Sequence, residues 1–137
     1  MGRNVKRALG PVVGIRELRE VGGARKVVTV RLGKPRKDPR GDWICPYQVN
    51  GLGRNGVQEA HGVDALQALQ LALEGIRTAL DRSGKSLSWT GGEPGDTGFT
   101  RSVPAFFGLD FSRRLEQLID HEVEQFSRAA EAKGHRE

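Results

Sequence analysis

The sequence of 137 residues contains a single cysteine, Cys45, so no disulfide can form within one chain. The fold must therefore rest on packing, and a lone thiol is typical of a reducing compartment. No apolar run is long enough to span a bilayer or to form the core of a signal peptide. We therefore expect a soluble, cytoplasmic protein that does not bind membranes.

Histidine is also scarce, and its positions predict no metal site. His61, His121 and His135 show no recognised ligand spacing with Cys45. The segment GLGRNG contains the pattern G-x-G-x-x-G, but no helix is expected directly after it, as a dinucleotide site would require. We therefore interpret this segment as a hairpin loop and expect no cofactor.

Acidic residues are few in the first forty positions, which carry twelve Lys or Arg against three acids. The remaining positions carry ten Lys or Arg against fourteen acids. The candidate basic patch consists of Arg3, Lys6, Arg7, Lys34, Arg36, Lys37 and Arg40. Such clustering either forms a solvated tail and polar loop or attracts nucleic acid.

Alternating apolar residues predict four strands, at VVGIRELRE, RKVVTVRL, DWICPYQVN and VQEAHG. The pattern leaves open whether residues 86–89 form a fifth short strand. The links between the four are short, which favours antiparallel pairing. In the third strand Trp43, Cys45, Tyr47 and Val49 share the more apolar face.

Two amphipathic helices are expected, over residues 64–84 and about 110–132. Asp64 and Asp110 are the candidate N-caps. The first helix is expected to bury Leu66, Leu69, Leu73, Ile76 and Leu80, in a stripe that Ala65, Ala68, Ala72 and Ala79 widen. The second is expected to bury Phe111, Leu115, Leu118, Ile119, Phe126 and Ala129. The element order predicts an α+β fold in which both helices pack on one face of an antiparallel sheet. We expect one domain over 13–132, a basic flexible N-terminus over 1–12 and a disordered tail over 133–137.

Cys45 and His61 form a candidate catalytic pair. If Val49 pairs with Val57, His61 lies opposite Cys45, and a histidine beside a cysteine can generate the nucleophilic thiolate. A third residue that would orient the histidine is not evident. The alternative is that Cys45 is a small buried core residue.

The segment between the helices is the candidate binding surface. Its glycines and prolines deny it regular structure, and loops of this length are usually functional or mobile. Asp96, Thr97, Phe99 and Arg101 place an acid, a hydroxyl, an aromatic ring and a guanidinium together, a mixture that protein interfaces favour. We expect the stretch from Asp96 to Arg101 to remain accessible, with Trp89 and Phe106 packed at the ends of the loop. Alternatively, Phe99, Phe106 and Phe107 only fill the core and the rest of the loop is solvated.

The segments DWICPYQVNGLG, GVDALQALQLAL, GFTR and RRLEQLIDHE together resemble a family of small bacterial proteins classed as a domain of unknown function. The resemblance extends from about residue 13 to residue 128 and implies no activity, ligand or catalytic residue. The strands that lead into a capped helix are also similar to the sheet-plus-helix half of HicB-type antitoxins. The C-terminus lacks the DNA-binding segment of that family.

Three functional hypotheses follow from the sequence. The first is a non-enzymatic module that binds a protein partner, in a role like that of an immunity protein or an antitoxin. The second is nucleic-acid binding through the basic first forty residues. The third is an enzyme that uses Cys45 and His61.

Overall fold

A computed structural model describes residues 7–22 and 26–134. The chain divides into two compact units, Met1–Arg101 (unit 1) and Ser102–Glu137 (unit 2), and each is described by itself. The single domain expected over 13–132 includes parts of both units. Residues 1–6 of the expected flexible N-terminus and residues 135–137 of the expected tail lie outside the described residues.

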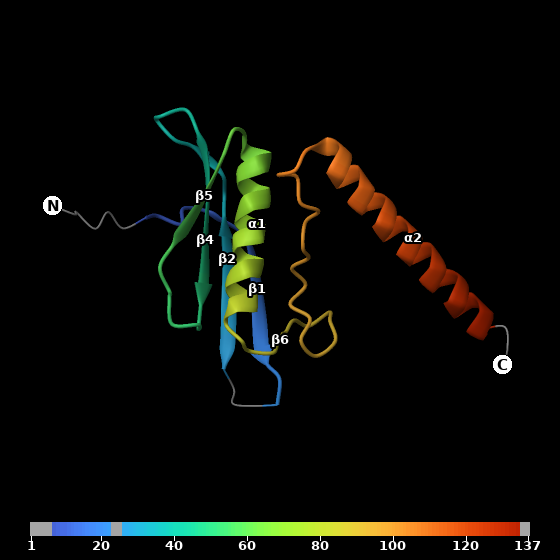
Figure 1. Ribbon diagram of the computed structural model, residues 1–137. Coiled ribbons are helices and arrows are strands. Elements are labelled where there is room, and N and C mark those ends of the chain that lie inside the picture. The colour runs from blue at the N-terminus through green and yellow to red at the C-terminus, as the bar shows by residue number, and fades with distance from the viewer. Residues whose placement is uncertain (1–6, 23–25, 135–137) are drawn as a thin grey trace. The chain divides into compact units, whose positions relative to one another are not determined.

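Unit 1 is an antiparallel sheet with one helix (Figure 1). Its elements are β1 (Val12–Glu20), β2 (Val27–Gly33), β3 (Arg36–Lys37), β4 (Trp43–Asn50), β5 (Gln58–Gly62), α1 (Ala65–Arg82) and β6 (Leu87–Ser88). The α+β class and the antiparallel sheet are confirmed. The four predicted strands correspond to β1, β2, β4 and β5, and the open fifth corresponds to β6. Only β3 was not foreseen, because it lies in a segment rich in proline and charge.

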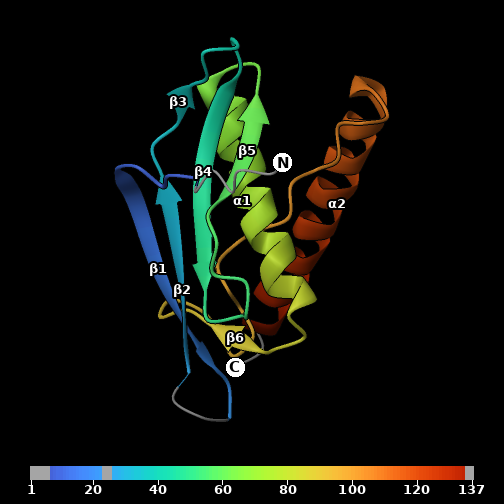
Figure 2. The ribbon, with the colours of Figure 1, turned by 90° about the vertical axis from the view of Figure 1, so that its left-hand side faces the viewer.

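The strand pairs define the order across the sheet. Tyr47 of β4 pairs with Leu32 of β2 on one side and with Gln58 of β5 on the other. The short β3 pairs with β4 beyond the end of β2, so β3 extends the line of β2. The sheet therefore runs β5–β4–β2–β1–β6, and Figure 2 shows β1 as its outermost long strand.

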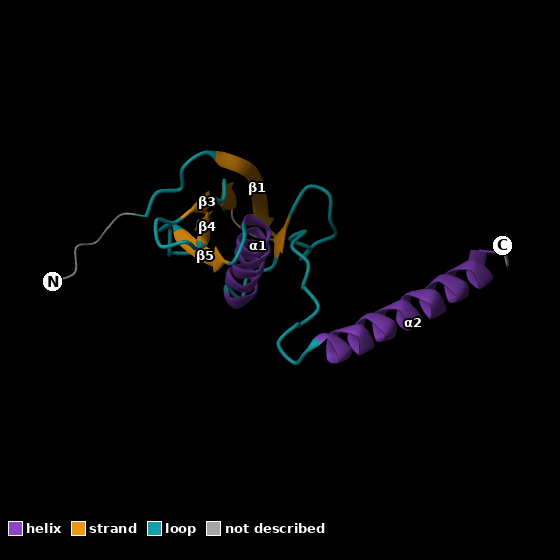
Figure 3. Ribbon diagram, turned by 90° about the horizontal axis from the view of Figure 1, so that it is seen from above, coloured by secondary structure: helices purple, strands orange, loops and turns teal. Residues whose placement is uncertain are grey.

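Helix α1 lies against one face of this sheet, as the view from above in Figure 3 shows. The core contains seven fully or nearly buried side chains, which are Leu18, Val28, Val30, Val49, Ile76, Leu80 and Leu87. A second cluster joins Cys45 to Ala68 and Ala72. The strand face predicted for β4 is confirmed by this packing.

The prediction of which α1 side chains are buried is wrong in part. Ala68, Ala72, Ile76 and Leu80 form the buried stripe, whereas Leu66 is 70% exposed and Leu73 is 39% exposed. The stripe is rotated because α1 approaches the sheet through small residues. At Gly75, an added Cβ atom would lie 2.4 Å from the Tyr47 hydroxyl oxygen, so no side chain fits there.

The first turn of α1 is capped as the sequence predicts. The Asp64 carboxylate accepts a hydrogen bond of 2.8 Å from the backbone N–H of Gln67. The Gln67 side chain accepts one of 2.7 Å from the N–H of Val63. These reciprocal bonds satisfy donors that the first turn leaves without an intrahelical partner.

The N-terminal segment of unit 1 lies across part of the other face of the sheet. The Pro11 carbonyl accepts a 2.8 Å hydrogen bond from Lys34 N–H. At Gly33, an added Cβ atom would lie 2.5 Å from the Leu9 carbonyl oxygen and 2.6 Å from Pro46 Cγ. Pro46 is fully buried although it points away from α1. Residues 7–11 therefore make specific contacts, where a flexible segment was expected.

Unit 2 consists of a short irregular segment and the long helix α2 (Leu109–Gly134). Asp110 was expected to be the N-cap of this helix. It lies instead in the first turn, as the second residue of α2. The Ser112 hydroxyl donates a 2.7 Å hydrogen bond to the Pro104 carbonyl, and the rings of Phe107 and Phe111 meet edge to face at 5.6 Å. The expectation that α2 packs beside α1 on the sheet stays a prediction.

Two truncations on α1 test the rotated stripe. Ile76→Ala should lower the free energy of unfolding by about 2–5 kcal/mol, because it leaves a cavity in the core. Leu66→Ala, at an exposed position of the same helix, should change it by less than about 0.5 kcal/mol. Urea titration followed by circular dichroism measures both values. Equal losses would show that the stripe faces the direction predicted from the sequence.

Candidate functional site

The candidate Cys45–His61 pair is not assembled. Cys45 pairs with Ala60, and His61 pairs with Ile44, so the register differs by one residue from the one expected. Because side chains alternate along a strand, this shift places the two side chains on opposite faces of the sheet. The hypothesis of a catalytic pair is therefore wrong.

Cys45 itself is a core residue. Its side chain is fully buried, and its Sγ donates a 3.5 Å hydrogen bond to the Gly33 carbonyl. Burial raises the pKa of the thiol, because desolvation disfavours the thiolate. A protonated, inaccessible thiol is a poor nucleophile.

The glycine pattern forms the hairpin loop between β4 and β5, as the sequence predicts. The Asn55 side chain closes the loop, since its Oδ1 accepts a 3.0 Å hydrogen bond from Gly51 N–H. The Gln48 side chain donates a 2.7 Å hydrogen bond to the Asn55 carbonyl. These contacts occupy the Gly51 N–H, one of the groups that would cradle a phosphate.

The chain after β6 folds into a compact loop, which we call the Trp89 strap (residues 88–99). Its ends are joined by a 3.0 Å hydrogen bond from Trp89 N–H to the Asp96 carbonyl. The Ser88 hydroxyl accepts a 2.9 Å hydrogen bond from Gly95 N–H. The strap is therefore closed by its own backbone.

Arg16 of β1 fixes the strap to the sheet. Its guanidinium carbon lies 4.3 Å from the centroid of the Trp89 ring and 4.8 Å from that of Phe99. One of its nitrogens donates a 3.3 Å hydrogen bond to the Thr97 carbonyl. A cation between two aromatic faces is stabilised by their quadrupoles. The sequence offered one indication of this role, because Arg16 lies two residues before the buried Leu18 and so shares its face of β1.

The indole of Trp89 lies against three glycines of the strap. Added Cβ atoms at Gly91, Gly92 and Gly98 would each lie between 2.5 and 3.0 Å from the indole. At Gly92 the added atom would also lie 2.6 Å from Asp96 Oδ2. The buried indole nitrogen makes no hydrogen bond within the described residues. The strap is thus shaped around the indole.

The predicted binding residues of this loop serve mainly to hold its shape. Asp96 Oδ1 accepts a 2.8 Å hydrogen bond from Gly98 N–H. Thr97 Oγ1 accepts one of 3.3 Å from Phe99 N–H, and Phe99 packs against the core. Asp96 and Arg101 are exposed as expected, whereas Thr97 and Phe99, which were also expected to be accessible, are half-buried. Trp89 is packed as expected, whereas Phe106 is 90% exposed, and a binding role for the four residues stays a prediction.

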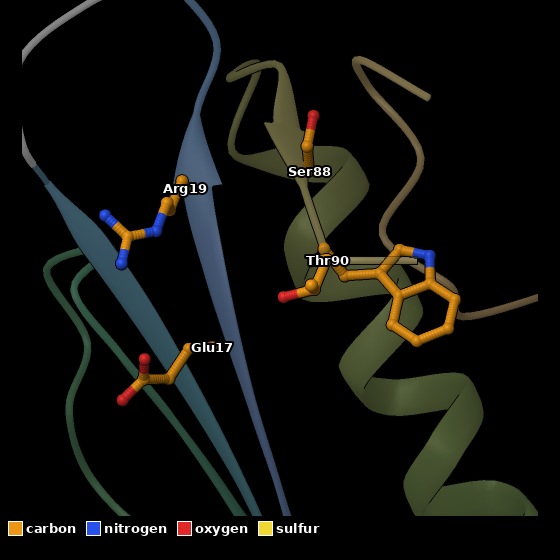
Figure 4. Close-up of a pocket in the computed structure, with 5 residues that line it drawn as sticks. Glu17, Arg19, Ser88 and Thr90 are labelled. Carbon is orange, nitrogen blue, oxygen red and sulfur yellow. The ribbon is translucent and has the colours of Figure 1, made fainter. Parts of the chain in front are cut away.

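A small open pocket lies where β1 meets β6. It is lined by Glu17, Arg19, Ser88, Trp89 and Thr90 and measures about 180 Å³. Figure 4 shows Glu17 and Arg19 on β1, with Ser88 and Thr90 on the adjoining segment. Binding sites for small molecules usually measure roughly 300–1,000 Å³. The pocket is therefore too small to be assigned as a ligand site.

Part of the candidate basic patch is already paired within unit 1. Arg7 and Arg36 each approach the Glu59 carboxylate, at 3.5 Å and 3.6 Å. Lys34, Lys37 and Arg40 are exposed around β3. Arg3 and Lys6 lie outside the described residues, and nucleic-acid binding stays a prediction.

Neither a membrane-crossing helix nor a metal site emerges from the part of the chain that the structure describes. No helix there is both long and apolar enough to cross a membrane. No group of three or more His, Cys, Asp or Glu side chains there is placed to hold a metal ion.

Comparison with known families identifies unit 1. The profile of DUF6968, described as a domain of unknown function, matches residues 15–101. The chain belongs to this family. The DUF6968 match confirms the predicted resemblance to a domain of unknown function, over a shorter range than the 13–128 expected. It ends at Arg101, where unit 1 also ends.

The DUF6968 match includes Arg16, Trp89 and the rest of the strap, whereas α2 lies beyond it. No curated protein and no solved structure matches the chain. The likeness to HicB-type antitoxins stays a prediction.

The burial of Cys45 predicts a slow thiol reaction. A soluble disulfide reagent should label native Cys45 far more slowly than Cys45 in urea, because labelling requires an accessible thiolate. The control is Leu66→Cys in a Cys45→Ser background, which presents a thiol on exposed α1 and should react quickly. Labelling of native Cys45 at the rate of this control would contradict its burial.

The contacts of Arg16 predict how the strap is held. Arg16→Met keeps an unbranched side chain but removes the cation and the bond to Thr97, so it should lower the free energy of unfolding by about 1–2 kcal/mol. In Arg16→Met, the exchange of backbone amide hydrogens should accelerate more at residues 95–99 than in β4. Arg19→Met, at an exposed position of the same strand, is the control. Unchanged exchange in Arg16→Met would show that the strap is held without the guanidinium.

Proposed function

We propose that the chain is a non-enzymatic module that binds a partner protein through the apolar stripe of α2. The α2 stripe consists of Phe111, Leu115, Leu118, Ile119, Val123 and Phe126. Five of the six are exposed, and Phe126 at 79% is the most exposed of them. This unpaired stripe is the observation that carries the proposal.

The composition of unit 2 supports a partner outside it. The described residues of unit 2 hold no second helix or strand against which α2 can bury its stripe. Only Ser112 of α2 is buried. A helix with one apolar side gains stability when that side is covered, and contiguous exposed apolar surface usually marks an interaction site.

Charge indicates the chemistry of the partner. The middle of α2 carries four acids, Glu116, Asp120, Glu122 and Glu124, and no Lys or Arg between them. Of these acids Glu116 and Glu122 lie at the stripe, whereas Asp120 and Glu124 lie toward the opposite side of α2, where Glu124 pairs with Arg128. The two acids at the stripe favour a partner whose apolar groove carries basic groups. Docking of an amphipathic helix in a groove is a common mode of peptide recognition. The same acids disfavour contact of this helix with nucleic acid.

A matched pair of substitutions tests the proposal. Phe126→Asp places a charge in the stripe, whereas Gln117→Asp adds the same charge on the opposite side of α2. A partner captured by the parent and identified by mass spectrometry should bind Phe126→Asp at least about tenfold more weakly, because buried aromatic anchors dominate interface energies. Gln117→Asp should bind with nearly the affinity of the parent. Calorimetric titration with the purified partner measures the three affinities.

Two results would contradict the proposal. Equal affinity of the parent and Phe126→Asp would show that the partner binds elsewhere. A much lower melting temperature for Phe126→Asp than for Gln117→Asp would show that the stripe stabilises the fold of the isolated chain.

A further inference from the structure

The face of the sheet opposite α1 carries a short buried strip. Gly33, Ile44 and Pro46 lie on this face, because each alternates with a residue that packs toward α1. All three are buried, although an antiparallel sheet usually leaves the face without a helix to water. Figure 3 shows that the chain leading into β1 lies on this side of the sheet, away from α1.

Residues 7–10 of that chain cover the strip. Of these residues only Leu9 is half-buried, and the others are exposed. An added Cβ atom at Gly33 would lie 2.5 Å from the Leu9 carbonyl oxygen and 2.6 Å from Pro46 Cγ, so both crowd the same glycine. Gly33 does not adopt a left-handed backbone angle, so these contacts alone exclude a side chain there. The strip and the segment are shaped to each other.

Two charged side chains complete the surface under the segment. Glu59 of β5 has a side chain that is only 13% exposed, and its carboxylate approaches the Arg7 guanidinium at 3.5 Å. Arg36 of β3 donates a 3.3 Å hydrogen bond to the Ala8 carbonyl. The segment is therefore recognised through a cation and a backbone carbonyl as well as through its apolar residue.

The contacts allow the segment to leave. No backbone–backbone hydrogen bond joins residues 7–10 to the rest of the described chain. The side chains of Arg7 and Arg36 are 54% and 42% exposed, and exposed ion pairs contribute little to stability. Arg36 itself approaches Glu59 at 3.6 Å, so departure of Arg7 leaves no unpaired carboxylate.

A glycine next to β1 supplies the hinge for this movement. Gly10 has a left-handed φ of 67°, which other residues rarely adopt. An added Cβ atom there would meet nothing within 4 Å, so the surroundings do not hold this residue in place. Hinges are a few residues that absorb changes of backbone angle, and glycine does so at low cost.

We propose that the surface under residues 7–10 binds an extended segment of a partner protein that carries Arg two positions before Leu. We call this surface the Gly33 site, and it consists of Gly33, Arg36, Pro46 and Glu59. Residues 7–10 then act as an internal competitor for it. The proposal is independent of the α2 stripe, because every contact lies within unit 1.

The internal occupant identifies the chemistry of the partner segment. Arg7 and Leu9 both contact the Gly33 site while Ala8 between them is exposed, which is the alternation of an extended chain. Backbone bonds supply affinity in this mode of recognition, and alternate side chains supply specificity. Glu59 selects the cation and repels an acidic segment. Nucleic acid would bring phosphates to the same carboxylate, so a peptide is the favoured occupant.

Tethering gives the internal segment an advantage over a free one. A short link provides an effective concentration of about millimolar at the site. A free segment with the same contacts must exceed that concentration before it displaces residues 7–10. The intact chain therefore rejects weak matches and accepts a partner that makes further contacts.

The end-blocked peptide RALGP, which has the sequence of residues 7–11, tests the proposal in titrations of the full chain followed by nuclear magnetic resonance. Arg7→Glu combined with Leu9→Asp should release the internal segment, because Glu59 repels the first new charge and the apolar strip excludes the second. The peptide should bind this double variant at least about tenfold more tightly than the parent, with shifts at Gly33 and Glu59. The peptide EALGP should not bind it.

Arg54→Glu combined with Leu66→Asp is the matched control, because it makes the same changes at exposed positions elsewhere in unit 1. It should bind RALGP as weakly as the parent does. Glu59→Gln, added to the released variant, should remove the gain in affinity. Gly10→Pro releases the segment through the backbone, because proline cannot adopt a φ of 67°, and it replaces the double variant if that variant does not fold.

Failure of RALGP to bind a folded released variant would overturn the proposal, because the Gly33 site would then accept no external segment. Equal affinity of the parent and the released variant would show that residues 7–10 do not compete. An equal gain in the matched control, or equal binding of EALGP, would show that the site does not select the Arg. Unfolding of both released variants would show that the segment is an inseparable part of the fold.

Discussion

The close approach of α1 to the sheet is the constraint on which the rest of unit 1 depends. Ala68, Ala72 and Gly75 let the helix come near enough to enclose Cys45 and to leave no room beside the Tyr47 hydroxyl. The larger Ile76 and Leu80 then fill the space above β1 and β2. From there the chain reaches β6 at the far edge of the sheet, where Leu87 is buried.

The sequence predicted the elements of the fold better than their contacts. Strand alternation and the Asp64 cap are local properties, and they placed β1, β2, β4, β5 and α1 within a few residues. The buried side of α1 is a tertiary property. The sequence predicted leucines and alanines as one wide stripe, but only the side that carries Ala68 and Ala72 permits the short helix–sheet distance. Helix propensity and hydrophobic periodicity are local properties of the sequence, so they do not predict that helix–sheet distance.

The candidate site shows the same division. The Cys45–His61 hypothesis depended on a strand register, and a shift of one residue separated the two side chains. The strap was recognised as a feature, but its organisation depends on Arg16, which lies some eighty positions from Thr97 in the sequence. Long-range contacts of this kind leave little trace in one sequence. Glu59 is a further case, because it pairs with arginines from two distant segments.

The packing of Trp89 has an evolutionary consequence. Gly91 and Gly92 lie outside the left-handed region of backbone angles, so neighbouring side chains are what forbid a side chain there: the indole alone at Gly91, and the indole together with Asp96 at Gly92. Selection on these two glycines should therefore be conditional. In DUF6968 relatives that keep the tryptophan, substitutions at both positions should be rare. In relatives that carry a smaller residue in its place, the position of Gly91 should be free to vary, whereas that of Gly92 should vary only where Asp96 is also replaced.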